Sequence, residues 1–162
     1  PGKPNFYGLH PSEANYARPG KKPLSSMSPT FFFRHVAGAE LGKLVLALGG
    51  SGGPKIITAT LQVFLNHLVN KAPLYESVVS PRLHEQLLYH QSASALFERA
   101  QLGRVLIEIP KNIRDDLEQR GHRLTAVDYT GCVQAVARYT KDQKQLLAGV
   151  SDIRKQGKPA GY

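Results

Sequence analysis

The chain is organised around one pattern of apolar and polar positions between residues 44 and 68. A short apolar run, Val45–Leu48, is typical of a buried strand. The loop Gly49–Gly53 follows, and Pro54 suits the first turn of a helix, where its missing N–H costs nothing. Beyond Pro54 the apolar residues recur every three or four positions and predict one buried helix face, made of Ile57, Leu61, Phe64, Leu65 and Leu68. The pattern therefore predicts a strand, a glycine loop and a helix in succession.

The rest of the chain is predicted to mix strands with short helices. The aromatic run in Met27–Phe33 favours a strand that forms an antiparallel hairpin with Lys43–Leu48. Asn112 suits the N-cap of a helix Ile113–Arg120, and Gly121 suits its end. Residues 91–111 are otherwise ambiguous. Further predicted elements are a helix Pro73–Val79, an extended run at Leu83, Leu87 and Leu88, and strands Arg104–Ile109, His122–Asp128, Cys132–Tyr139 (after the turn Tyr129–Gly131) and Leu146–Val150.

The order of these elements indicates the fold class. Helices and strands alternate irregularly, and the last strands follow one another directly, which favours an α+β architecture of layered sheets over a doubly wound parallel sheet. Residues 1–24 hold five of the eleven prolines and no periodic pattern, so we expect an ordered, loop-rich entry rather than a tail. Phe6, Tyr7 and Tyr16 are expected to attach this entry to the body of the domain.

Four glycines in five positions cost backbone entropy, about 0.5–1 kcal/mol each relative to alanine, so the loop Gly49–Gly53 needs a reason. One reason is an anion site: a glycine loop that opens a helix exposes backbone N–H donors to a phosphate, a carboxylate or the oxyanion of acyl transfer. The other is a tight strand-to-helix turn with no ligand. The loop lacks both the Lys-Ser/Thr of a P-loop and the spacing of a dinucleotide fingerprint.

A second polar cluster precedes the first predicted strand. The adjacent hydroxyls of Ser25 and Ser26 can donate hydrogen bonds to an anion, most simply a carboxylate, or can satisfy the backbone of an ordinary turn. In the predicted hairpin these serines start one strand, and the glycine loop leaves its antiparallel neighbour. We therefore expect Ser25, Ser26 and the glycine loop to lie at the same edge of one sheet.

Composition and charge narrow the remaining possibilities. The 162 residues with 41% hydrophobic content suit one domain or part of a larger one. The net charge of +9 is spread along the chain and not clustered with aromatics, which favours a solvated basic surface over nucleic-acid binding. No apolar run reaches the ~18–20 residues of a membrane span. Cys132 lies in an apolar segment and is expected to be a small buried hydrophobe.

Motifs for other chemistry are absent from the sequence. The histidines, among them His10, His35, His84 and His90, have no metal-ligand spacing, so no metal and no cofactor is predicted. No nucleophile elbow stands out. The acidic side chains after Asn112 are expected to favour the helix N-terminus rather than form a catalytic dyad; they are Asp115, Asp116 and Glu118. Because the chain opens with Pro1 and not with methionine, we expect a processed product, a subunit or a fragment.

Four motifs occur in a fixed order along nearly the whole chain. They are PGKKPLSSMSPT at 19–30, GGSGG at 49–53 with Ile56–Thr58, PRLH at 81–84, and SDIRK at 151–155 with PAGY at 159–162. Together they resemble the C-terminal part of the small subunit of γ-glutamyltranspeptidases. Residues 1–162 would then be one incomplete part of that subunit's catalytic domain.

The resemblance implies an N-terminal-nucleophile hydrolase fold, a four-layer αββα sandwich. It implies transfer of the γ-glutamyl group of glutathione, or another γ-glutamyl donor, to water, an amino acid or a dipeptide. Ser25 and Ser26 match serines that hold the donor's α-carboxylate, and Gly52 and Gly53 match oxyanion-hole glycines. The family's nucleophile is a threonine with its own amine as base, and this chain contains no matching motif.

The resemblance also implies partners and a location. The large subunit of the same precursor would complete the site, and family members act at the extracellular face of the plasma membrane or after secretion. The chain departs from the family pattern at 91–110 and at Ile153, where a proline is expected. Two alternatives stay open: a catalytically silent homologue kept as an interaction module, and a phosphate-binding module built on the glycine loop.

Overall fold

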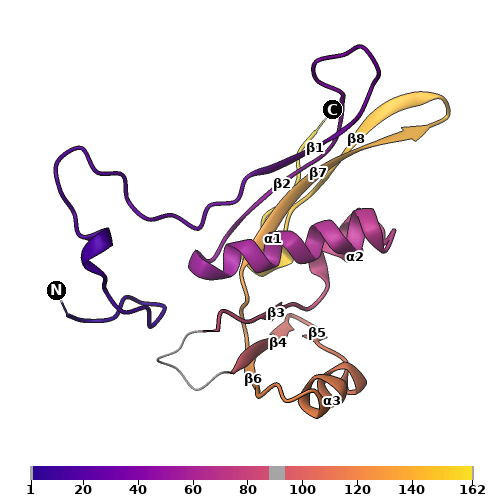
Figure 1. Cartoon of the computed structure of the whole chain (residues 1–162). Helices are drawn as coiled ribbons and strands as arrows, with labels where there is room; N and C mark the ends of the chain where they lie inside the picture. Colours follow the sequence, from indigo (N-terminus) through magenta and orange to yellow (C-terminus); the bar gives the residue numbers. More distant parts are fainter. Residues whose placement is uncertain (1, 88–93, 162) are drawn as a thin grey trace.

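The computed structural model describes residues 2–87 and 94–161 (Figure 1). Four antiparallel strands form the first sheet, in the order β1-β2-β7-β8. Their bounds are Thr30–Arg34, Lys43–Ser51, Cys132–Lys141 and Lys144–Val150. The hairpin predicted between the first two strands is confirmed, with Thr30 opposite Leu48.

A second, smaller sheet is built on β4 (Ala95–Leu102), which pairs antiparallel with β3 (Leu83–His84) and β5 (Val105–Glu108) and parallel with β6 (Leu124–Val127). Helix α3 (Lys111–Gln119) joins β5 to β6. The predicted strands around the turn Tyr129–Gly131 therefore do not belong to one hairpin, since β6 lies in this sheet and β7 in the first. Strand β4 lies within residues 91–111, where the pattern of apolar and polar positions was ambiguous.

Helices α1 (Ile56–Phe64) and α2 (Leu74–Val79) cover one face of the first sheet (Figure 1). A five-residue π-helix, Leu65–Val69, continues α1. The core between helices and sheet is made of small and branched side chains: Leu46, Leu48, Ala59, Val63, Leu74, Val78, Val133, Ala135 and Ala137. Strand β7 alternates buried and exposed residues, as expected of a strand with only one covered face.

The predicted buried face of α1 is wrong in its main members. The helix buries Ile56, Ala59, Thr60 and Val63, whereas Ile57, Leu61 and Leu65 are 54%, 50% and 38% exposed. Phe64 and Leu68 do pack against the core, and the Phe64 ring stacks on Phe32 with centroids 4.3 Å apart. The helix carries two apolar stripes, and the one with the smaller residues faces the sheet, where Ala59 allows close approach.

Several boundaries differ from the prediction. Strand β1 starts at Thr30 and not at Met27, and α3 starts at Lys111 with Pro110 as its N-cap. Asn112 is therefore not a cap, and the first turn of α3 holds no acidic residue. Leu88, His90, residues 91–93 and Tyr162 lie outside the described residues, so the predictions on them are not tested.

Residues 2–29 form a mostly exposed, extended segment that loops out to one side of the sheets and helices, with one short 3₁₀ turn at Glu13–Asn15 (Figure 1). Phe6 is 95% exposed and contacts the Tyr7 ring edge-on, so it does not attach the segment to the body. Tyr7 does make such an attachment, because its ring lies against Gly53. Within residues 2–87 and 94–161, no helix is long and apolar enough to cross a membrane.

Candidate functional site

The strand-to-helix turn consists of Gly52 and Gly53 and is shorter than predicted. Strand β2 continues through Ser51, and a 3₁₀ turn, Gly53–Lys55, leads directly into α1. Gly52 has φ 136° and Gly53 has φ 61°, values that residues with a side chain rarely adopt. A Cβ on Gly52 would lie 2.8 Å from Cα of Gly131, and one on Gly53 would overlap the Tyr7 ring. Gly52 is therefore required by conformation and by space, whereas Gly53 is required by its conformation and an added side chain there would displace the Tyr7 ring.

The other two glycines of the predicted loop are strand residues. A Cβ on Gly50 would come within 2.6 Å of the Cys132 carbonyl oxygen, so Gly50 is needed for the close approach of β7. Gly49 has no such neighbour, since its nearest contact is Pro29 Cα at 4.0 Å. The cluster thus serves two purposes: sheet packing before Ser51 and a left-handed turn after it.

The segment between β6 and β7 packs against the turn and is hydrogen-bonded to the residues on either side of it. Tyr129 donates its hydroxyl to the Ser51 carbonyl (3.3 Å), and its own carbonyl accepts from Lys55 Nζ (2.8 Å). Gly131, with φ 100°, packs directly on Gly52. The sequence placed a turn here but did not connect it with the glycine pair, because the two segments are far apart in the chain.

The turn has the features of an anion site. Gly53 is the first residue of the 3₁₀ turn, so its N–H has no partner within that helical segment. The dipoles of the 3₁₀ turn and of α1 add positive potential at the same point. Lys155 Nζ, from the 3₁₀ turn Ile153–Lys155, donates to Ser51 Oγ (2.7 Å) and brings a full positive charge beside the glycines. The sequence pattern did not predict that Lys155 would lie beside the glycine turn.

The two predicted serines lie at the same end of the first sheet as this turn. Since Thr30 pairs with Leu48, the segment before β1 runs beside the end of β2, and Pro29 lies next to Gly49. Ser25 is exposed, and its Oγ accepts from the Met27 N–H (3.1 Å), which leaves its hydroxyl hydrogen to donate to a ligand. Recognition of a carboxylate by Ser25 and Ser26 stays a prediction.

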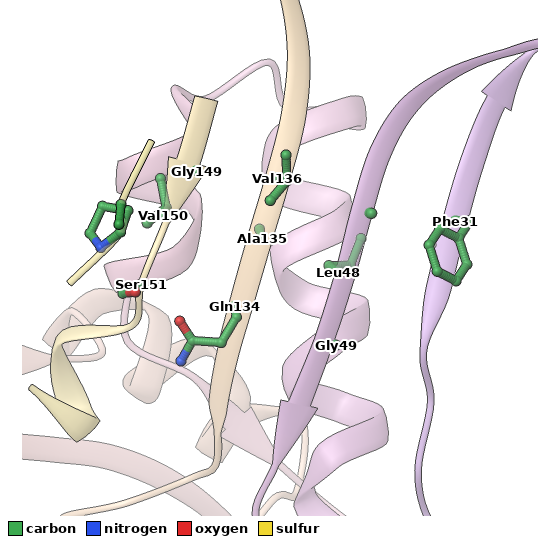
Figure 2. Close-up of a pocket in the computed structure, with 12 residues that line it drawn as sticks. Phe31, Leu48, Gly49, Gln134, Ala135, Val136, Gly149, Val150 and Ser151 are labelled. Atoms are coloured by element: carbon green, nitrogen blue, oxygen red, sulfur yellow. The ribbon is translucent and has the colours of Figure 1, made fainter. Parts of the chain in front are cut away.

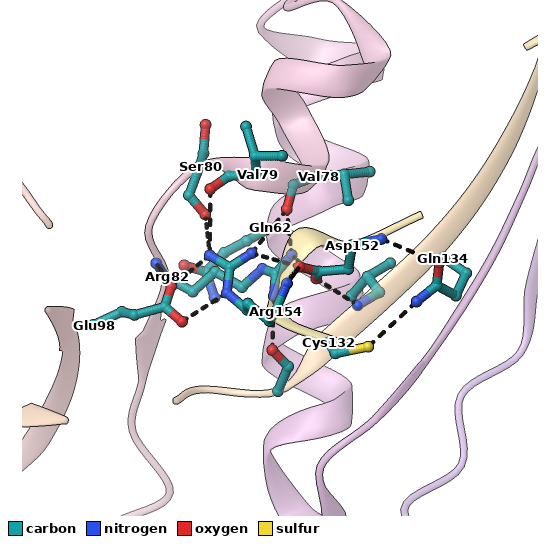
Figure 3. Close-up of polar contacts among 12 residues, drawn as sticks. Gln62, Val78, Val79, Ser80, Arg82, Glu98, Cys132, Gln134, Asp152 and Arg154 are labelled. Carbon is teal, nitrogen blue, oxygen red and sulfur yellow. Dashed lines mark hydrogen bonds and ion pairs between the residues drawn. The ribbon is translucent and has the colours of Figure 1, made fainter. Parts of the chain in front are cut away.

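Behind the turn lies a buried network of two arginines and two carboxylates (Figure 3). Arg154 forms a bidentate pair with Glu98 (2.7 and 2.6 Å) and a further bond to Asp152 (2.9 Å). Arg82 pairs with the other oxygen of Asp152 (2.9 Å) and donates to the Gly131 carbonyl (2.8 Å). All four side chains are at most 1% exposed, so their charges are compensated only by one another and by nearby backbone.

The network lowers the pKa of Asp152. Burial opposes the charge of Asp152, but Arg82 and Arg154 outweigh it and hold the pKa of this carboxyl below its usual range. Because Arg82 also holds Gly131, which packs on Gly52, the network supports the turn from the interior. The sequence marked PRLH and SDIRK as motifs but did not predict that their arginines would meet.

The remaining predictions concern metals and histidines. No group of three or more His, Cys, Asp or Glu side chains that could hold a metal ion lies within residues 2–87 and 94–161. His84 is buried and binds Thr58 of α1 (Nδ1 to Oγ1, 2.8 Å). Cys132 is buried and unpaired, as predicted.

Comparisons with known proteins agree with this arrangement. The family model for γ-glutamyltranspeptidase matches residues 1–162. Glutathione hydrolase 2 of Arabidopsis thaliana is 39% identical over 156 residues, which cover 94% of this chain and 25% of the relative. The chain thus spans about a quarter of the length of this relative.

Solved structures give the same result for the fold. A crystal structure of acivicin-inhibited γ-glutamyltranspeptidase matches with a TM-score of 0.76 and 32% identity, covering 97% of this chain and 75% of the other. The T380A mutant of Helicobacter pylori γ-glutamyltranspeptidase matches with a TM-score of 0.74 and 32% identity, covering 94% and 73%. These neighbours are N-terminal-nucleophile hydrolases with an αββα sandwich, and the predicted fold class is confirmed. From its matched length, its motifs and its fold, the chain belongs to the γ-glutamyltranspeptidase family.

Proposed function

We propose that the complete protein is a γ-glutamyltransferase and glutathione hydrolase. It transfers the γ-glutamyl group of glutathione, or of a related donor, to water, an amino acid or a dipeptide. The observation that carries the proposal is the Gly52–Gly53 turn, a left-handed pair at a helix start with Ser25 and Ser26 at the same end of the sheet. The names of the relatives, glutathione hydrolase and γ-glutamyltranspeptidase, support the same reaction.

The chemistry assigned to this chain is binding and charge stabilisation. A threonine nucleophile outside these residues attacks the γ-carbonyl carbon of the donor, and its own amine takes the proton. The carbonyl oxygen then becomes an oxyanion, which the N–H groups of Gly52 and Gly53 stabilise. Ser25 and Ser26 hold the donor's α-carboxylate by charge-assisted hydrogen bonds. Lys155, beside Ser51, favours an anionic donor by its charge.

The large subunit of the same precursor is the proposed partner. The first sheet carries α1 and α2 on one face, while its other face has a shallow pocket among Phe31, Val136, Gly149 and Ser151 (Figure 2). Phe31, Val136 and Leu147 are 62%, 41% and 63% exposed there, an unusual amount of apolar surface for strands. In a four-layer αββα sandwich, a second sheet covers this face. We also propose, from the family resemblance, that the protein acts outside the cell or at the outer face of the plasma membrane.

The test compares this chain with the complete precursor, using a chromogenic γ-glutamyl anilide as donor. We expect turnover from the complete protein and none from residues 1–162, because loss of the nucleophile removes the covalent step itself. A complete protein that folds but releases no anilide would instead favour a catalytically silent homologue. Turnover by the isolated chain would refute the assignment of the nucleophile.

A further inference from the structure

The contact between α1 and β3 has no role in the chemistry described above. Thr58, in the first turn of α1, and His84, in β3, are joined by a 2.8 Å contact between Oγ1 and Nδ1. The other ring nitrogen of His84, Nε2, lies 3.2 Å from Oε1 of Gln86. His84 is only 6% exposed, so both of its ring nitrogens are engaged inside the protein.

The partners of His84 determine which way the hydrogen bond runs. The Gln86 side-chain oxygen can only accept, so Nε2 carries the ring hydrogen and Nδ1 is left as an acceptor for the Thr58 hydroxyl. Burial lowers the pKa of His84, and the nearby charge of Lys55 works in the same direction, which favours this neutral ring.

Strand β3 is a firm support for His84, because α1 also binds its backbone. One turn beyond Thr58, Gln62 accepts from the Leu83 N–H (2.8 Å) and donates to the Leu83 carbonyl (2.8 Å). The Gln62 amide thus replaces a neighbouring strand and fixes the backbone that carries His84. Thr58 is therefore bound to a strand that cannot shift independently along the helix.

Thr58 in turn is connected to the glycine pair through Lys55. The hydroxyl hydrogen given to His84 cannot also bind the Lys55 carbonyl oxygen, 3.2 Å away. The connection therefore runs through the backbone of Gly53–Lys55, which leads directly into α1 and in which the Lys55 N–H donates to the Gly52 carbonyl (3.3 Å). The Lys55 ammonium binds the Tyr129 carbonyl (2.8 Å), on the opposite side of the turn. We therefore expect a displacement of Thr58 to shift the backbone of Gly52 and Gly53.

We propose that His84 is a positioning residue: its bond to Thr58 holds the first turn of α1, and with it the N–H groups of Gly52 and Gly53, where the oxyanion forms. The inference rests on the proposed function. A displacement of catalytic groups by about 1 Å costs about 100-fold in rate, so a hydrogen bond that fixes the first turn of α1 is expected to affect kcat although it touches no reacting atom.

The first test is kinetic and uses the complete protein with a γ-glutamyl anilide. Thr58→Val removes the hydroxyl but nearly keeps the shape, and we expect kcat to fall about 10- to 100-fold with little change in KM. Thr58→Ser keeps the hydroxyl and should retain most of the kcat of the parent. His84→Asn, whose amide atoms are bonded to Cγ as Nδ1 is, should retain more activity than His84→Leu. An unchanged kcat in Thr58→Val, or an equal loss in Thr58→Ser, would overturn the inference.

A second measurement does not depend on activity. Hydrogen exchange of a peptide covering residues 51–56 should be faster in Thr58→Val than in the parent and unchanged in Thr58→Ser. His122→Gln is the matched control, since His122 pairs with Glu85 (3.0 Å) beside His84 and should alter neither exchange nor kcat. Equal exchange in all variants overturns the positioning role, whereas a parent without transfer activity rejects the proposed function alone.

Discussion

The glycine turn and the buried charge network adjoin each other but depend on different interactions. At the turn, Gly52 and Gly131 approach closely because they have no side chains, and Gly52 and Gly53 hold positive φ angles that favour glycine. In the network, Arg82 and Arg154 are held by Glu98 and Asp152, and each carboxylate is bound from more than one direction. The turn is thus an open region, with Gly52 and Gly53 partly exposed, whereas the network is a closed region whose side chains are at most 1% exposed. The Arg82–Gly131 bond links them, so the closed region supports the open one.

The largest expected effect comes from breaking the closed region. Asp152→Asn should lower the stability of the complete protein by about 3–5 kcal/mol, because it leaves Arg82 and Arg154 buried with too little negative charge. The measurement is the denaturant midpoint of unfolding. The matched control is Asp115→Asn, whose ion pair with Lys111 is exposed and should be worth less than about 0.5 kcal/mol. Equal small effects in both variants would mean that the network is not a stability determinant.

Next comes the open region, where Gly53→Ala is expected to affect catalysis more than folding. The positive φ of Gly53 strains any residue with a side chain, and the added methyl group would displace the Tyr7 ring, so we expect the turn to shift and its N–H groups to move away from the oxyanion position. Loss of one oxyanion donor costs about 10²–10³ in kcat, roughly 2.7–4 kcal/mol. Gly49→Ala is the control, since no atom lies within ordinary contact of its Cβ position except Pro29 Cα at 4.0 Å.

Steady-state kinetics beside a thermal melt separates the two explanations for Gly53. A normal kcat in Gly53→Ala would remove the oxyanion role. A collapsed melting temperature with a proportional loss of active protein would assign Gly53 to the fold alone. Adding Tyr7→Ala to Gly53→Ala should relieve the overlap with the ring but not the backbone strain.

A smaller effect is expected for substrate binding by the serines. Replacing Ser25 and Ser26 by alanine should raise KM for the γ-glutamyl donor, because each charge-assisted hydrogen bond to a carboxylate is worth about 1.5–3 kcal/mol. The change in kcat should be minor by comparison. Ser28→Ala is the control, since its hydroxyl donates to the Ser26 carbonyl within the segment (3.1 Å). A double variant with an unchanged KM would show that the serines are only turn residues.

The smallest effect is a pH dependence of stability from His84. Its folded pKa lies below the ordinary value of about 6.5, so the unfolded chain binds more protons as the pH falls below that value. The neutral His84 ring therefore contributes its full stabilisation above about pH 6.5, and this contribution is lost as the pH falls toward the folded pKa. His84→Asn should flatten that part of the stability profile. The same slope in the variant and the parent would exclude His84 as its source.

The sequence by itself determined most of the local elements and the family. The apolar run Val45–Leu48, the glycines and Pro54 gave the strand, turn and helix, and the aromatic run gave the hairpin that brings Ser25 and Ser26 to the end of β2. These predictions succeeded because they depend on residues close in the chain, through periodicity, backbone conformation and turn chemistry. The motifs added the family, which the matched fold confirmed.

Only the tertiary structure decided which surfaces meet. Periodicity predicted one apolar face on α1, with Ile57 and Leu61, but the face with Ala59 packs on the sheet, because that choice depends on the shape of the partner strands. In the same way, Gly131, Tyr7 and Lys155 reach the turn from distant segments, and no local pattern encodes such contacts. The physical reason is that local preference follows from neighbours in the chain, whereas burial and charge pairing follow from neighbours in space.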